Sequence, residues 1–221
     1  MAKLFTMLEE SDHSLKIRKD THELRIDVEL STRFKSLKVA TTIDFFDHII
    51  ETLSWGACLS IGCVVETGKW RSTHTIAEDV GITIGTGLKR FFTRKLKEEG
   101  INITGSCIFG LDEALARVMV SMEGRRNAFF YTAPECTAIQ LELVEDMKTQ
   151  DLFAFVEGFF QGFPGTAHVD FLKGRDPHHT WECAVHALGE SLRHAYAANP
   201  WRKAANNPYY ADEGIADAAL E

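Results

Sequence analysis

The sequence predicts an α+β protein built as a tandem repeat of two similar halves, each a split β-α-β sandwich with helices on one face of its sheet. Two observations support this class. Short segments that alternate apolar and polar side chains predict half-buried strands, and longer segments with apolar residues at helical spacing predict helices. The same ordered set of segments then occurs twice along the chain.

The expected elements can be placed by residue range. Residues 24–30 and 115–122 alternate apolar and polar side chains and predict strands, and residues 58–65 are expected to form another strand. Residues 78–97 and 180–197 carry apolar residues at helical spacing, which predicts two helices. The expected stop signals are Gly100 for the first helix and Asn199-Pro200 for the second.

The repeat is most evident around two histidine motifs. His74-Thr-Ile-Ala-Glu78 and His178-His-Thr-Trp-Glu182 are each followed by a glycine at the same distance, Gly85 and Gly189. This offset of 104 residues is the same throughout the motif. Upstream, residues 26–30 match residues 118–122, and residues 45–50 match residues 155–160.

The repeat divides the chain into a first half at 1–103, a second half at 104–198 and a C-terminal tail at 199–221. The prolines and asparagines at the start of the tail predict a loop. Residues 211–221 are acidic and rich in alanine, which suits either a short helix or a frayed end.

Composition excludes several classes of protein. The 221 residues are 45% hydrophobic and 25% charged, which is typical of a globular chain and not of collagen, a coiled coil or a disordered tail. A net charge of −8 argues against nucleic-acid binding, because the basic run at 89–97 suits the end of a helix. The absence of a long apolar run or a leader argues against a membrane partner and predicts a cytoplasmic location. Five irregularly spaced cysteines predict buried free thiols.

Two histidine–glutamate pairs predict metal binding. His74 and Glu78 are four residues apart, as are His178 and Glu182, so on a helix each pair projects from one face. His179, three residues before Glu182, can share that face. Imidazole and carboxylate without thiolate suit Mn, Fe, Co, Ni or Zn, and the recurrence predicts two similar sites. For either pair taken alone, the alternative is an ordinary solvated helix surface.

Three further groups allow either a chemical or a plain surface role. Glu23, at the start of a predicted strand, suits a general acid or base, or an edge charge. Asp112-Glu113, before the strand of the second half, allows the same two interpretations. Arg125, in Gly124-Arg-Arg126, suits a turn or an anion-binding guanidinium.

The order and spacing of five motifs resemble those of one enzyme family. These motifs are Phe45-Phe-Asp-His48, His74-Thr-Ile-Ala-Glu-Asp-Val-Gly81, Asp112-Glu-Ala-Leu-Ala-Arg117, Glu123-Gly-Arg125 and His178-His-Thr-Trp-Glu182. From Thr21 to Tyr196 the chain resembles the imidazoleglycerol-phosphate dehydratases of histidine biosynthesis. The resemblance implies a tandem α/β repeat and a homo-oligomer of trimers that form a hollow 24-subunit shell. It also implies two Mn ions per active site, held at contacts between subunits.

The resemblance further implies metal ligands from six histidines and two glutamates. Thr75 and Gly158 stand where the family has histidines, so one of the two Mn sites is expected to be weak, empty or completed by another residue. His168 is the candidate for that residue, and other divalent metals are also compatible. The six positions that match are His48, His74, Glu78, His178, His179 and Glu182.

The implied substrate-binding residues are Arg125, Asp112 and His186, but this region departs from the family. Ile103 stands at the position of an arginine, His186 at that of a lysine, and the tail lacks a Ser-Thr-Lys-Gly loop. Phosphate recognition normally uses several charge-assisted hydrogen bonds, so other cations would have to replace the missing ones. The available candidates are Lys173, Arg175, Arg202 and Lys203.

Three hypotheses follow. The first is a metal-dependent lyase that dehydrates the small molecule imidazole glycerol phosphate to imidazole acetol phosphate, with Glu23 as acid/base and Glu182 as a second catalytic carboxylate. The second is a divergent relative that uses the same metal-site scaffold on a less anionic substrate. The third is a non-catalytic shell protein, against which the retained ligands argue.

Overall fold

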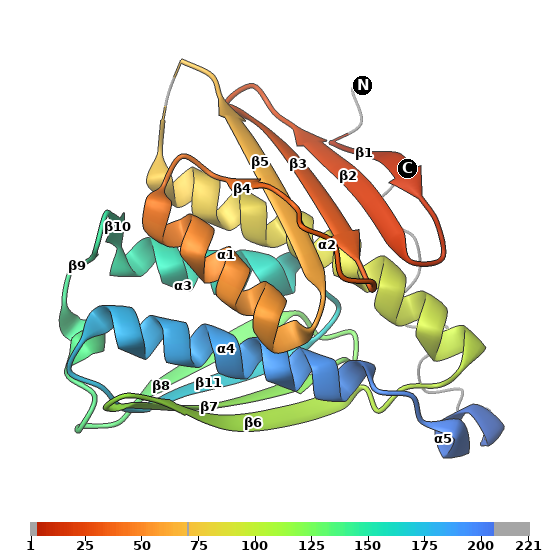
Figure 1. The fold of residues 1–221 in the computed structure, drawn as a ribbon. Helices are drawn as coiled ribbons and strands as arrows, with labels where there is room; N and C mark the ends of the chain where they lie inside the picture. The colour runs from red at the N-terminus through yellow and green to blue at the C-terminus, as the bar shows by residue number, and fades with distance from the viewer. Residues whose placement is uncertain (1–3, 70, 206–221) are drawn as a thin grey trace.

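The computed structural model describes residues 4–69 and 71–205. Two sheets enclose a central layer of four helices, so that each sheet is covered by helices on its inner face (Figure 1). The helices of this layer are α1 (Asp44–Ala57), α2 (Thr73–Glu98), α3 (Thr149–Gly162) and α4 (Pro177–Tyr196).

The first sheet has the strand order β1-β2-β3-β5-β4, with β4 parallel to β5 and the other neighbours antiparallel. The alternating pattern of β3 places its apolar side chains, from Leu24 to Leu30, in the core. The strands are β1 (Phe5–Glu10), β2 (Ser14–Asp20), β3 (Leu24–Ser31), β4 (Val39–Ala40) and β5 (Ser60–Thr67).

The second sheet has the order β6-β7-β11-β8, with β8 parallel to β11 and the other neighbours antiparallel. This is the arrangement of β2-β3-β5-β4, so the predicted two-half repeat is confirmed and β1 is an addition to the first half. The strands are β6 (Thr104–Leu111), β7 (Ala114–Ser121), β8 (Asn127–Thr132) and β11 (Thr166–Lys173).

Short elements lie outside these layers. A small hairpin of β9 (Leu143–Val144) and β10 (Met147–Lys148) precedes α3, and a 3-10 turn, η1, covers Ala138–Gln140. The tail begins with the helix α5 (Pro200–Ala204) where a loop was expected, because Asn199 caps it and Pro200 suits the first helical position. The predictions for 206–221 lie outside the described residues.

The two predicted helices begin earlier than their apolar pattern indicated. α2 begins at Thr73 because the Ser72 hydroxyl accepts the backbone N–H of Thr75. α4 begins at Pro177 because the Asp176 carboxylate accepts the N–H of His179. These caps place the two histidine motifs in the first turns of their helices.

Glycines allow the helices of the central layer to approach each other closely. A Cβ on Gly81 or Gly85 of α2 would overlap a backbone oxygen of α3, and a Cβ on Gly158 or Gly162 of α3 would overlap one of α2. Helices α1 and α4 approach similarly, since a Cβ on Gly189 would lie 2.7 Å from the backbone nitrogen of Ala57. Larger residues at these positions would push the helices apart.

Two other sequence expectations concern thiols and membranes. All five cysteines are free, but Cys58 is exposed and Cys107 is half-buried, so the expectation of buried thiols was wrong for these two. Cys58 ends α1 in a left-handed conformation, which places its side chain at the surface. Within the described residues, every helix is too short or too polar to cross a bilayer.

The glycine contacts make a stability prediction. Gly85→Ala should lower the free energy of unfolding by about 1–3 kcal/mol, because the new methyl group meets rigid backbone of α3. Gly110→Ala is the control, since the nearest atoms to its Cβ would lie 3.7 Å away. Denaturant unfolding would measure both changes, and equal stability of the two variants would contradict the packing argument.

Candidate metal centre

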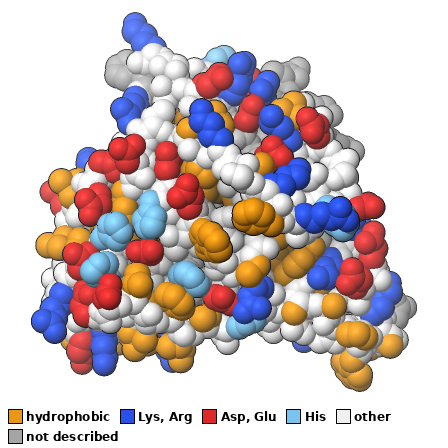
Figure 2. All heavy atoms as spheres, in the orientation of Figure 1, with side chains coloured by type: hydrophobic (Ala, Val, Ile, Leu, Met, Phe, Trp, Pro, Cys, Tyr) orange, Lys and Arg blue, Asp and Glu red, His pale blue; other side chains and the backbone are white. Residues whose placement is uncertain are grey.

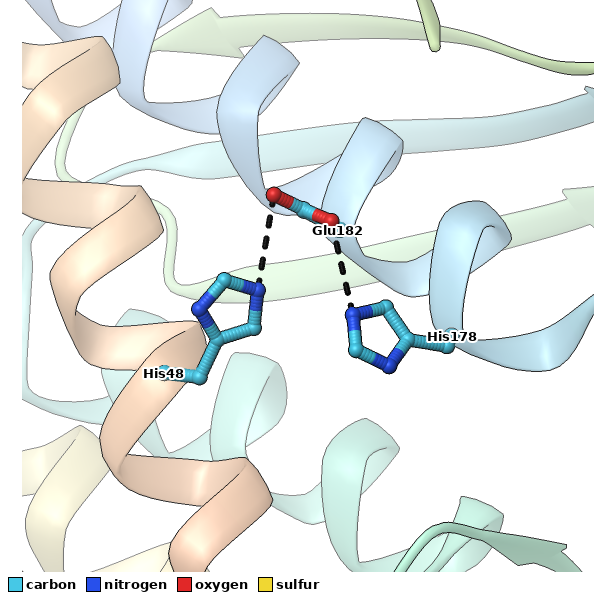
Figure 3. Close-up of side chains that lie close together, drawn as sticks. All are labelled: His48, His178 and Glu182. Carbon is cyan, nitrogen blue, oxygen red and sulfur yellow. Dashed lines mark ion pairs between the residues drawn. The ribbon is translucent and has the colours of Figure 1, made fainter. Parts of the chain in front are cut away.

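Three side chains converge where α1 and α4 cross. His48 Nε2 lies 3.4 Å from Glu182 Oε1, and His178 Nε2 lies 3.5 Å from Glu182 Oε2 (Figure 3). One ligand atom from each residue falls within 4.8 Å of the others, a spacing at which a single ion can be bound. These three residues are half of the six that the resemblance implies as metal ligands, and they come together within one chain.

Helix packing brings the three residues together. His178 and Glu182 are one turn apart on α4, and His48 comes from the second turn of α1. A Cβ on Gly56 of α1 would lie 2.6 Å from the backbone oxygen of His186 on α4, so a larger residue there would separate the two helices. Figure 2 shows histidine and acidic side chains gathered on this part of the surface.

The donor set of the cluster suits a divalent metal. Within the described residues, His48 Nε2 is buried and makes no hydrogen bond, although the His48 side chain as a whole is 39% exposed. A buried imidazole nitrogen without a partner carries a desolvation cost that a bound cation would remove. Two imidazoles and a carboxylate fit Mn, Zn or Fe(II).

His179 lies beside the cluster and points to another pair of carboxylates. Its Nδ1 is 3.0 Å from Glu113 Oε2, and its Nε2 is 3.7 Å from Asp112 Oδ2. Hydrogen bonds from the Asp176 backbone N–H and from His179 lower the pKa of Glu113 to about 2. The hydrogen bond with Glu113 raises the pKa of His179 above its ordinary value.

The other histidine–glutamate motif lies at the start of α2, apart from the cluster. His74 is 60% exposed, and its Nδ1 lies 3.5 Å from Oδ1 of the buried Asp151 on α3. Glu78 Oε1 accepts a hydrogen bond of 3.3 Å from Gln161 Nε2. His74 and Glu78 therefore do not join His48 within one chain.

One of the two positions where the resemblance implies a histidine has a structural explanation. Thr75, in the first turn of α2, donates to Ser72 only a backbone N–H, which a histidine would equally supply. A Cβ on Gly158 would overlap the backbone oxygen of Glu78, so no larger side chain fits where α2 and α3 cross. A histidine at position 158 would require the helices to separate.

Within one chain, His168 lies apart from the cluster. It lies on the outer face of β11 and stacks on Phe129, while α4 covers the inner face of the same sheet. Arg125 and Arg126 share a surface pocket of about 550 Å³ with His168. The two guanidinium groups of Arg125 and Arg126 therefore lie on the face of the second sheet that is opposite to the helices.

The remaining predicted residues lie in different places. Glu23 is exposed in the turn between β2 and β3, and its backbone oxygen accepts the Gly68 N–H. His186, one turn beyond Glu182 on α4, stacks on Phe109 with ring centroids 3.9 Å apart. Ile103 is buried in the core, so it offers no surface for a substrate.

Sequence reasoning missed three acidic residues at the site. Glu145 Oε1 lies 3.1 Å from His178 Nδ1, Asp146 binds the start of α1, and Asp151 faces His74. Helical spacing could not reveal them, because Asp146 is 102 residues from its partner Asp44. The only local signal was a Glu-Asp pair in a segment with turn character.

The Glu113–His179 pair makes a pH prediction for the metal-free protein. The pKa of Glu113 is lowered, so its ionised carboxylate stabilises the folded state fully above pH 4.5. This stabilisation of the fold is lost as the pH falls toward 2. His179 has a raised pKa, so its stabilisation is present below pH 6.5 and is lost as the pH rises through its folded-state pKa. Glu113→Gln should therefore destabilise the fold most between pH 4.5 and 6.5.

Denaturant unfolding across this pH range would measure the effect. Glu135→Gln is the control, because Glu135 is also an exposed carboxylate. A difference between wild type and Glu113→Gln that does not vary with pH would contradict the pairing.

Comparison with known proteins places this geometry in a family. Residues 41–192 match the family model described as imidazoleglycerol-phosphate dehydratase. The chain is 32% identical over 184 residues to the imidazoleglycerol-phosphate dehydratase of Azoarcus sp. (strain BH72), which covers 81% of this chain and 88% of the relative. It is 30% identical over 195 residues to that of Paracidovorax citrulli (strain AAC00-1), with coverages of 86% and 88%.

Solved structures show the same fold. Imidazoleglycerol-phosphate dehydratase from Staphylococcus aureus subsp. aureus N315 superposes with a TM-score of 0.71 at 22% identity, covering 84% of this chain and 99% of that one. The Pyrococcus furiosus protein in complex with (S)-C348 gives 0.68 at 26% identity, with coverages of 82% and 94%. The chain described here therefore belongs to the imidazoleglycerol-phosphate dehydratase family.

Proposed function

We propose that this chain is a metal-dependent hydro-lyase that converts imidazole glycerol phosphate to imidazole acetol phosphate, a step of histidine biosynthesis. One observation carries the proposal. His48, His178 and Glu182 converge within reach of one ion, in a chain that belongs to this family. The buried Nε2 of His48 has no hydrogen-bond partner among the described residues, and a bound cation would supply one.

The metal we propose is Mn, with other divalent metals as substitutes. His48, His178 and Glu182 would hold one ion, and His74, Glu78 and His179 are the candidates for a second. When bound, the metal would act as a Lewis acid and as a template for the substrate. Because Thr75 and Gly158 offer no imidazole, one ion per chain is a possible outcome as well as two.

The candidate residues would have to meet across a contact between copies of the chain. His74 is 60% exposed and Glu23 is exposed, while the cluster at His48 is open to solvent on one side. We therefore propose a homo-oligomer, built from trimers and up to a 24-mer, in which these groups of one copy face the cluster of another. Occupancy of the metal would then be linked to assembly.

The residues of the chain would move protons and bind the anion. A carboxylate suits proton transfer at a poorly acidic C–H, and we assign this general acid/base role to Glu23. Arg125 is exposed beside a second guanidinium, that of Arg126, which suits a phosphate group. Of the other cations considered, Arg175 lies next to the first turn of α4, whereas Arg202 lies beyond its far end.

A second candidate function is favoured by two positions. Ile103 is buried and apolar, and position 186 carries a histidine in place of the lysine that the resemblance implies, so two cations expected for a phosphate are replaced. A divergent lyase or isomerase that acts on a less anionic substrate would need no such contacts.

Metal content and turnover distinguish the candidates. The purified protein should contain one or two Mn ions per chain and should dehydrate imidazole glycerol phosphate when Mn is added. Bound metal without turnover would favour the divergent enzyme. The absence of both metal and turnover would contradict the proposal and favour a non-catalytic shell protein.

Removal of one ligand should reduce both metal content and assembly. His178→Ala leaves two of the three cluster residues, so the bound Mn per chain should fall at least tenfold at limiting metal. The oligomer size, measured by light scattering, should fall with it. His13→Ala is the control, since His13 lies between β1 and β2 and its Nδ1 lies 3.3 Å from the Thr32 hydroxyl. Unchanged metal content and unchanged size in His178→Ala would contradict the assignment.

A further inference from the structure

The turn between β9 and β10 contacts both helices, α1 and α4, that carry the candidate ligands His48, His178 and Glu182. Val144 pairs with Met147, which leaves Glu145 and Asp146 as the two residues of the turn. Glu145 reaches α4 and Asp146 reaches α1, as the hydrogen bonds of each show. In Figure 1 this hairpin lies at the end of the molecule where α4 begins.

Asp146 replaces the missing cap of α1. The residue before this helix is Ile43, whose side chain cannot accept a hydrogen bond. The Asp146 carboxylate accepts the backbone N–H of Asp44 at 2.9 Å and that of Phe45 at 3.0 Å. His48 follows Asp44 by one turn, so fixing the first turn of α1 also fixes the position of His48.

Glu145 determines which nitrogen of His178 faces the cluster. Its Oε1 lies 3.1 Å from His178 Nδ1, and Nε2 on the opposite side of the ring lies 3.5 Å from Glu182 Oε2. A carboxylate at Nδ1 retains the proton on that nitrogen, so the lone pair is on Nε2. Carboxylate partners of this kind orient histidines that bind metals and raise their basicity.

The same arrangement recurs at the other candidate histidines. His179 Nδ1 lies 3.0 Å from Glu113 Oε2, and His74 Nδ1 lies 3.5 Å from Asp151 Oδ1. In all three cases a carboxylate outside the expected ligand set faces Nδ1. A recurrence at three histidines, two at the start of α4 and one at the start of α2, is not explained by one accidental surface contact.

The backbone of the turn favours a different residue at position 145. Glu145 has φ of 51°, in the left-handed region where glycine is preferred. If position 145 only had to form the turn, glycine would suit it better than glutamate. We therefore attribute the presence of glutamate to the contact that its side chain makes with His178.

We propose that the Glu145–Asp146 turn is a positioning element of the metal site. Glu145 holds His178 with Nε2 toward His48 and Glu182, and Asp146 holds the start of α1 that carries His48. The inference rests on the proposed function, because it requires that the cluster binds a metal.

The test uses Glu145→Gly in the full-length protein. Glycine relieves the left-handed backbone, so the melting temperature of the metal-free variant should equal or exceed that of wild type. Its affinity for Mn, measured by titration with detection of free Mn by electron paramagnetic resonance, should fall by about 10–100-fold. The visible spectrum of the Co-loaded variant should also change, because the orientation of a ligand is altered.

Two further variants complete the design. Glu145→Gln keeps an oxygen that accepts the Nδ1 proton, so it should recover part of the lost affinity. Glu142→Gln removes a negative charge from an exposed position just before β9 and should leave the affinity unchanged.

The outcomes separate this inference from the proposed function. If wild type binds no Mn, the proposed metal-dependent function fails and the inference fails with it. If wild type binds Mn and Glu145→Gly binds it equally tightly, only the inference is overturned. A metal-free Glu145→Gly that melts well below wild type would also overturn it, because the glutamate would then serve the fold.

Discussion

The close approach of the central helices determines where every candidate ligand lies. Glycines at the crossings of α1 with α4 and of α2 with α3 leave no space for a side chain between the helix backbones. Helices that touch at their backbones have little freedom to slide or rotate, since interiors are packed to near crystal density. His48 and Glu182 meet because of this contact, and for the same reason position 158 admits only glycine.

Most of the candidate metal-binding histidines lie at the starts of helices. Ser72, Asp176 and Asp146 satisfy the free N–H groups at the starts of α2, α4 and α1, respectively. These caps fix the first turns, in which His74, His178 and His179 lie. Capping and ligand positioning therefore occur in the same helix turns, and each of these histidines has a carboxylate beside Nδ1, which leaves Nε2 as the nitrogen for a metal.

The departures from the family pattern follow from packing and burial. Gly158 lies against the backbone of Glu78, and the Ile103 side chain is buried in the core. The ring of His186 stacks on the ring of Phe109. These positions have structural roles in this chain, so metal binding and anion recognition depend on the residues that remain.

The sequence by itself determined the fold class, the internal repeat and the candidate residues. Alternation at 24–30 and helical spacing at 180–197 are local patterns that report which side chains are buried, and β3 and α4 lie there. His178 and Glu182 could be paired because four residues make one helical turn. Side-chain caps place the helix starts several residues before the first residue of the apolar pattern. An apolar pattern carries no information on such caps.

Only the tertiary structure decided which distant residues meet. It brought His48 to Glu182, placed His168 on the outer face of its sheet and brought Glu145 and Asp146 to the starts of two helices. Spacing along a chain carries no information on these contacts, because each depends on the direction in which one element packs on another. A local sequence pattern specifies whether a segment forms a helix or a strand, and tertiary packing specifies which distant residues that segment contacts.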